Sequence, residues 1–321
     1  MSRLIRLHPP LMITALLMAA LSVWCLIGLA VDDRLLLGVP IWLKPLKFSV
    51  SVMIYSVTLA WLISLLTKRR LASAMGTVIA VTALIEMAAI VGQAARGHRS
   101  HFNFATTLDG ALFMLMAVSI VVLWVATAIV AIQLIRQKIG DRPAAYAIRA
   151  GILVAIAGLA EGFFMTRPKP GQIDAAASGG ERIFGAHSIG VADGGSGLPF
   201  VNWSTEGGDL RVGHFIGMHA LQALPLFALA LTLLGRRIGR LADDQTRARL
   251  VLTASTAYAG LTALVTWQAL RGQSVVHPDA LTWTAAGVLG VIVVVGIGWA
   301  LRPPVRPAGR PASALPEVAV R

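Results

Sequence analysis

The chain has 321 residues, of which 56% are hydrophobic and only 13% are charged. Its mean hydropathy of +0.74 excludes an ordinary soluble domain, whose surface needs more charge, and predicts a polytopic membrane protein. The formal net charge of +13 is placed in short loops between apolar runs, where basic residues set membrane orientation. We expect the lipid bilayer as a partner and no nucleic acid, because no aromatic-basic face accompanies the charge.

Apolar runs of about 18 or more residues, the length that crosses a bilayer, recur along the chain. They predict about eight spanning helices, at about 11–31, 48–67, 71–94, 107–135, 145–166, 211–234, 247–270 and 281–301. The fold class is therefore all-α, a polytopic transmembrane helical bundle over residues 1–301. Most of the 28 basic residues lie in cytoplasmic segments if the N-terminus is inside, so we expect both termini to be cytoplasmic, in a bacterial inner membrane.

The first helix contains the single cysteine, Cys25, so a disulfide within the chain and a cysteine zinc site are excluded. The segment 38–48 follows, with prolines at 40 and 45 and with Lys44 and Lys47 on either side of Pro45. Two interpretations stay open for it. It is an interfacial turn whose lysines extend to water, or the lysines attract an anion such as a haem propionate.

The third helix has Glu86 and Gln93 on one face, since the two are seven residues apart. The turn after it carries polar residues at the non-cytoplasmic surface, and Asp109 opens the next helix. Its candidate residues are Ser100, His101 and Asn103, whereas His98 is interpreted as a solvated residue. An ionisable side chain inside a span is costly and is a functional hypothesis by default. Glu86, Asp109 and, on the fifth helix, Glu161 are therefore the candidate catalytic acids.

Residues 167–210 predict a long non-cytoplasmic loop, rich in glycine, in which His187 is expected to be solvated. Asp209 is expected to cap the sixth helix. That helix carries His214 and His219 just inside the membrane, and depth estimates place His219 level with Glu86 and His214 level with Gln93. The polar mouth is completed by Trp203, Glu206 and Arg211. Residues 302–321 predict a disordered cytoplasmic tail.

Three segments, 42–48, 94–103 and 203–222, resemble an uncharacterised family of bacterial multi-pass membrane proteins. They read Trp-Leu-Lys-Pro-Leu-Lys-Phe, Ala-Ala-Arg-Gly-His-Arg-Ser-His-Phe-Asn and Trp-Ser-Thr-Glu at the start of the third. The resemblance implies a common membrane fold over the first six helices and transfers no activity.

The leading functional hypothesis is a redox protein that binds haem b, with His101 and His219 as axial ligands and His214 as the alternate. Glu86 would tune this site, Lys44 and Lys47 would meet the propionates, and another membrane protein would exchange electrons. A copper site using His214 and Met218, which lie four residues apart, is a variant of it.

Two alternatives remain open, so the sequence leaves it undecided whether the chain is an enzyme. One is an intramembrane lipid hydrolase whose zinc is held by His101, His219 and an acid. The other is a proton-coupled carrier or sensor of a small ligand, using Glu86 and His219. The oligomeric state is left open as well.

Overall fold

The computed structural model describes residues 7–303, and eight of the helices in this range are long and apolar enough to cross a membrane. They are α2 (Pro9–Val31), α3 (Leu43–Ser64), α4 (Arg70–Ala95), α5 (Thr107–Arg136), α6 (Arg142–Ala160) with its short continuation α7 (Gly162–Met165), α9 (Leu210–Leu234), α11 (Asp244–Leu270) and α12 (Ala280–Ala300). The predicted helical bundle is confirmed. Helix α10 (Gly239–Ala242) is a single turn before α11.

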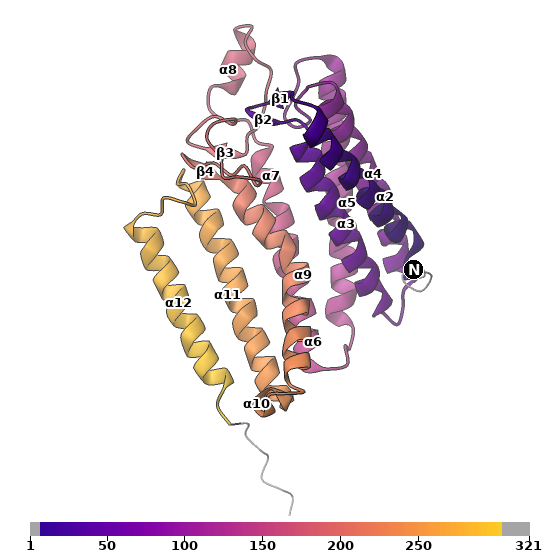
Figure 1. Ribbon diagram of the computed structural model, residues 1–321, viewed down its shortest axis with the longest axis vertical. Coiled ribbons are helices and arrows are strands. Elements are labelled where there is room, and N and C mark those ends of the chain that lie inside the picture. The colour runs from indigo at the N-terminus through magenta and orange to yellow at the C-terminus, as the bar shows by residue number, and fades with distance from the viewer. Residues whose placement is uncertain (1–6, 304–321) are drawn as a thin grey trace, which may run out of the picture.

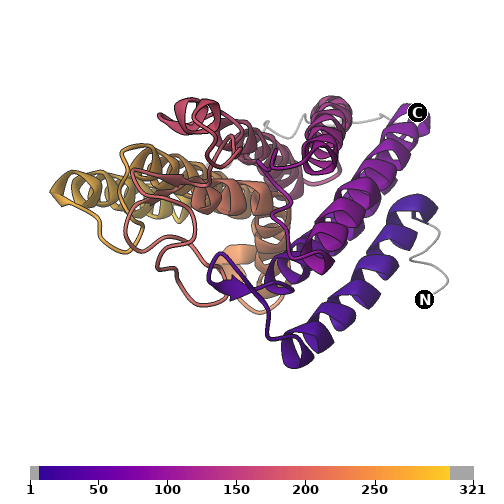
Figure 2. The same ribbon diagram turned by 90° about the horizontal axis from the view of Figure 1, so that it is seen from above.

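The helices form two groups that follow the order of the chain (Figure 1). Helices α2 to α5 pack on one another, and α6, α9 and α11 form the second group, with α12 against α11. Helices α5 and α6 join the groups. Figure 2 shows from above that α2 and α12 lie at opposite edges of the bundle. Apolar side chains fill the contacts within each group, and the largest buried cluster combines residues of both groups, such as Leu62, Ile152 and Leu221.

Irregular structure gathers at one end of the bundle, which we call the loop end (Figure 1). It contains α7, α8 (Gln172–Ala177) and two antiparallel strand pairs, β1 (Leu35–Leu36) with β2 (Val39–Pro40) and β3 (Ser188–Ile189) with β4 (Gly208–Asp209). The residues predicted to form the site lie at or near this end. It is therefore the part of the molecule in which polar chemistry is possible.

Side-chain caps begin several of the helices. Thr106 accepts from the amide of Asp109 at the start of α5, and Asp209, predicted as a cap, accepts from the amide of Arg211 at the start of α9. Asp243 and Asp279 cap α11 and α12 in the same way. Each cap satisfies an amide that the helix itself leaves without an acceptor, which matters most next to a hydrocarbon phase.

The start of α3 differs from the prediction, because the helix begins at Leu43 rather than near residue 48. Pro45 is the third helical residue, where its missing N–H is one that the first turn leaves unpaired anyway. The two lysines therefore belong to the first two turns of a helix and not to an interfacial turn. Their side chains are held in register by the helix, one turn apart.

The segment between α7 and α9 is more ordered than a solvated loop. Strand β3 pairs with β4, and Ile183 pairs with Asn103 in an isolated bridge. The segment therefore folds back on the turn between α4 and α5. The tail predicted as disordered lies, apart from residues 302 and 303, outside the described residues.

Helices α6 and α9 cross at two glycines with their backbones in direct contact. A Cβ built at Gly158 would lie 2.5 Å from the amide nitrogen of Met218 and 2.6 Å from Cα of Gly217. Real Cβ atoms do not approach backbone this closely, so only glycine fits. Close crossings of this kind allow dispersion contacts between spanning helices, which hydrocarbon chains would otherwise replace.

We expect Gly158→Ala to lower the thermal unfolding temperature of the purified protein in detergent, because the added methyl group forces α6 away from α9. Overpacking of this kind costs about 1–3 kcal/mol. Gly287→Ala is the matched control, since a Cβ at Gly287 on α12 meets nothing within 4 Å. Equal unfolding temperatures for the two variants would contradict the close-crossing argument.

Candidate functional site

A lysine, a histidine and a serine meet at the loop end. Lys44 Nζ lies 3.0 Å from His101 Nδ1, and Ser100 Oγ lies 3.0 Å from the same nitrogen. Lys44 comes from the first turn of α3, and His101 comes from the turn between α4 and α5. The rings of Phe48 and Phe113 pack beside the imidazole, with centroids 5.9 and 6.3 Å away. Aromatic walls thus fix the imidazole between its polar neighbours.

Glu86 occupies the other side of the same imidazole. Its Oε1 lies 3.5 Å from His101 Nε2, which is longer than an ordinary hydrogen bond. Its Oε2 is buried and has no hydrogen-bond partner within the described part of the chain. The lysine ammonium has only protons to offer, so Nδ1 of His101 accepts and the ring proton sits on Nε2, facing Glu86. The three side chains form a chain, Lys44–His101–Glu86, that ends on an open carboxyl oxygen.

Burial, and then the positive charge of Lys44, hold the pKa of His101 well below its usual value of 6.5. The side chain of His101 is 21% exposed. The neutral imidazole is therefore the folded-state form at neutral pH, in agreement with its role as a hydrogen-bond acceptor at Nδ1.

Asp109 is fully satisfied and acts as a structural anchor. It accepts from Gln93 Nε2 at 2.8 Å, from Arg96 Nη1 at 3.1 Å and from the Thr106 hydroxyl at 2.8 Å. His98 Nδ1 lies 3.5 Å from its second oxygen. Together these bonds tie the end of α4 to the start of α5. Asp109 and Gln93, both predicted as site residues, therefore position the turn that carries His101.

His187 is not solvated, contrary to the sequence-based expectation. Its Nδ1 lies 3.0 Å from Asp193 Oδ2, its ring packs on Phe102 at 5.1 Å, and its side chain is 22% exposed. Asp193 also accepts from the amides of His187 and Ser188. Sequence reasoning passed over Asp193, because no spacing rule links two residues six apart in a glycine-rich segment. The pair locks this segment against Phe102, whose φ of 64° is strained for a bulky residue.

Lys47 and Arg211 bind a hairpin of residues 196–205, which we call the tip. Lys47 Nζ donates to the carbonyl of Val201 at 3.0 Å, and Arg211 donates to the carbonyl of Asn202 at 2.5 Å. Arg211 also forms an ion pair with Asp209, at 2.6 Å. Of the other predicted mouth residues, Trp203 packs on Phe215 of α9 and Glu206 accepts from Ser196 at the surface.

Glu161 lies in the second helix group, where α6 passes into α7. Its Oε1 accepts from Thr266 of α11 at 2.7 Å, and its Oε2 is buried without a partner among the described residues. Gly213 makes room for it, since a Cβ there would lie 2.4 Å from that oxygen. Glu161 is thus a second buried carboxyl group, apart from the Lys44–His101–Glu86 chain.

The two histidines of α9 have separate partners. His214 Nδ1 donates to the carbonyl of Gly158 at 2.7 Å. His219 Nδ1 lies 3.3 Å from Gln222, and the Phe215 ring packs on it at 4.5 Å. No ion-pair distance joins His219 to Glu86 within residues 7–303; Glu86 lies beside His101 instead. The depth estimate from the sequence placed Glu86 and His219 towards the same end of the bundle, but it did not identify His101 as the neighbour of Glu86.

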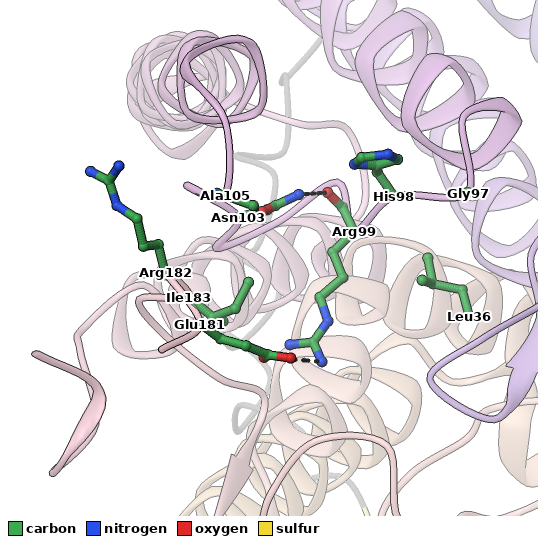
Figure 3. Close-up of a pocket in the computed structure, with 9 residues that line it drawn as sticks. All are labelled: Leu36, Gly97, His98, Arg99, Asn103, Ala105, Glu181, Arg182 and Ile183. Carbon is green, nitrogen blue, oxygen red and sulfur yellow. Dashed lines mark hydrogen bonds and ion pairs between the residues drawn. The ribbon is translucent and has the colours of Figure 1, made fainter. Parts of the chain in front are cut away.

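A surface cleft of about 250 Å³ opens near this site (Figure 3). Of the predicted residues it includes only Asn103, whose amide donates to the carbonyl of Arg99. Arg99 lies 4.0 Å from Glu181 across the cleft, and Arg182 points away from it in Figure 3. The cleft is therefore a feature of the turn surface, separate from the Lys44–His101–Glu86 chain.

Comparison with known proteins does not identify a family or a function for this protein. No protein-family model, curated protein or solved structure matches this chain. The resemblance noted from short segments remains a prediction, and the functional argument depends on the geometry alone.

The predicted metal ligands do not converge. Within residues 7–303, no three histidine, cysteine, aspartate or glutamate side chains are placed to hold a metal ion.

A haem iron needs only axial nitrogen ligands. Both ring nitrogens of His101 face protein groups, however: Nδ1 faces Lys44 and Ser100, and Nε2 faces Glu86. His101 therefore fits a haem iron poorly unless Glu86 moves.

Absorption spectra test whether His101 and His219 bind haem. We expect a purified sample from haem-supplied cells, oxidised and then reduced with dithionite, to lack a Soret band, because Glu86 lies 3.5 Å from Nε2 of His101, where the iron would have to approach. A Soret band that disappears in His219→Ala but persists in His277→Ala would contradict this expectation and restore the haem hypothesis.

We also expect stability to fall in acid because of the His187–Asp193 pair. Burial lowers the pKa of His187, against the opposing effect of Asp193. Burial raises the pKa of Asp193, but bonds from His187 outweigh it and leave that pKa below its usual value. The folded protein then binds fewer protons than the unfolded chain. Stability is fully present above pH 6.5, the usual value for histidine, and is lost as pH falls through the lowered pKa of His187.

The unfolding temperature would be measured from about pH 8 to about pH 5, the range in which histidine titrates. In His187→Gln the unfolding temperature should decrease less on acidification, because the glutamine side chain does not gain a proton on unfolding. An unchanged pH profile in His187→Gln would show that other groups carry the effect.

Proposed function

We propose that the protein is a proton-coupled carrier of a small polar solute, with the Lys44–His101–Glu86 chain as its proton-binding site. Eight apolar helices support the assignment to a membrane. The observation that carries the proposal is the buried Oε2 of Glu86, which has no hydrogen-bond partner among residues 7–303. Such an oxygen is costly to bury unless it receives a proton or a hydrogen bond from a ligand.

The three side chains Lys44, His101 and Glu86 have the order of donors and acceptors that proton transfer requires. Lys44 donates to Nδ1 of His101, and the proton on Nε2 faces Glu86 at 3.5 Å. Transfer of a proton from Lys44 to Nδ1, with release of the Nε2 proton to Glu86, leaves a neutral imidazole in its other tautomer. Ser100, 3.0 Å from Nδ1, holds the ring while this happens.

The arrangement of the helices suits a carrier. Lys44 belongs to the first helix group, and the tip that its neighbour Lys47 binds leads into α9 of the second group. Polar contacts therefore cross between the groups at the loop end, and Gln222 of α9 donates to Thr58 of α3 deeper in the bundle. Carriers commonly move one group of helices against another around a site at their junction. We place the loop end on the non-cytoplasmic side, in a bacterial inner membrane.

A transport assay tests the proposal. Proteoliposomes would be offered labelled alanine, lactate, glutamate and glucose, with the external solution either at the internal pH or more acidic. We expect at least one solute to enter several-fold faster under the acid gradient, and Glu86→Gln to remove that acceleration, because the amide cannot take up a proton.

Glu181→Gln is the matched control, since Glu181 is 81% exposed on the loop surface. Gradient-driven uptake that is equal in Glu86→Gln and in the unmodified protein would exclude Glu86 as the coupling group. Uptake of none of the four solutes under either condition would count against a carrier of small polar solutes.

A further inference from the structure

Two cationic side chains contact the tip, Lys47 and Arg211, and a third, Lys44, lies near them. Lys44 and Lys47 lie in the first two turns of α3, and Arg211 lies in the first turn of α9. Their positive charges are near enough to repel one another, and Glu86, Asp193 and Asp209 are near enough to offset part of that repulsion. Arg211 is paired with Asp209, but within residues 7–303 neither lysine forms an ion pair with an acid. The N-terminal ends of both helices add positive potential at the same place.

Neutral carbonyl groups occupy the positions that an anion would take. The carbonyl oxygens of the consecutive residues Val201 and Asn202 accept from Lys47 and Arg211, respectively. A cation bonded to a carbonyl keeps its full charge, whereas an oxyanion would neutralise it and form shorter, stronger hydrogen bonds. The two carbonyls thus mark two adjacent acceptor positions between α3 and α9.

The tip that supplies these carbonyls is held in an unfavourable conformation. Phe200 and Asn202 have φ of 63° and 55°, a left-handed region that favours glycine. Phe200 is 82% exposed, so no packing compensates for its conformation. Backbone hydrogen bonds between Leu198 and both Asn202 and Trp203 close this turn, so its conformation does not depend on the two cations.

We propose that Lys47 and Arg211 bind the carboxylate of a small organic acid in place of the carbonyls of Val201 and Asn202, with Lys44 completing the positive surface. The inference deepens the proposed function by naming the class of solute, an organic anion. Displacement of the tip accompanies binding. A proton taken up at Glu86 would then travel with a negatively charged solute, which reduces the charge moved across the membrane.

Trp203 gives a direct readout of this displacement. It belongs to the tip and packs on Phe215 of α9, with ring centroids 5.9 Å apart. Binding would be followed as the change in tryptophan fluorescence when sodium lactate is added to the detergent-purified protein, against sodium chloride at equal ionic strength. Trp203→Phe identifies the part of the signal that comes from the tip.

We expect a saturable change with lactate that chloride does not produce and that Trp203→Phe loses. Lys47→Gln and Arg211→Gln should each weaken the apparent affinity about tenfold or more, since each removes a charge-assisted hydrogen bond. Arg99→Gln is the matched control, because this arginine lies on the same end of the bundle beside Glu181 and should keep the affinity. Lys47→Gln leaves the Arg211–Asp209 pair intact, so it tests the site even if Arg211→Gln fails to fold.

Three outcomes would overturn the inference. They are the absence of a saturable response to lactate, an unchanged affinity in Lys47→Gln, and an equal loss in Arg99→Gln. Nanodiscs separate a soluble acid from a lipid headgroup that offers similar chemistry. Equal responses in phosphatidylcholine and phosphatidylglycerol nanodiscs support a soluble acid, and a response abolished by phosphatidylglycerol overturns it.

The proposed function fails independently of this inference. Lactate binding that persists in Glu86→Gln, without any effect of a pH gradient on uptake, would keep the anion site and remove proton coupling. Gradient-driven uptake of alanine or glucose that is lost in Glu86→Gln, without any fluorescence response to lactate, would keep proton coupling and remove the anion site.

Discussion

The arrangement of polar groups follows from one constraint, that hydrocarbon offers no hydrogen bonds to the side chains and backbone it surrounds. The protein meets it by keeping ionisable groups near the two ends of the bundle and by giving most of the buried ones at the loop end partners. Asp109 illustrates this, with its buried carboxylate bound by Gln93, Arg96 and Thr106. Groups that depart from this rule are for that reason informative.

In the described part of the chain, Glu86 and Glu161 are the buried carboxyl groups with an oxygen that lacks a partner, and their surroundings differ. Glu86 adjoins an imidazole and, through it, a lysine, so a proton has a route to it. Glu161 accepts from a single threonine in the other helix group. Glu86 thus ends a series of polar side chains, whereas Glu161 lies in a nearly apolar contact between α6 and α11. The functional argument therefore centres on Glu86.

The sequence predicted the bundle well because hydropathy over a bilayer-length window depends on local residues alone. It predicted the site less well, because Lys44 and His101 are 57 positions apart and only packing brings them together. The prolines near Lys44 favoured a turn, although proline is compatible with the first turn of a helix. His187 was misjudged because the glycines around it suggested solvation, whereas Asp193 and Phe102 bury it.

The two helix groups differ in how soon their contacts become available during synthesis. Helices α2 and α3, and likewise α4 and α5, pack as neighbours in sequence, so the first group can assemble as soon as it leaves the ribosome. Helix α6 has its main partner in α9, which follows only after the tip and the strands. Lys44 and Lys47 are therefore in the membrane before Arg211 and the tip exist. A chain stopped before the tip would present Lys47 without its carbonyl acceptor on Val201, a chemical mark of incomplete synthesis.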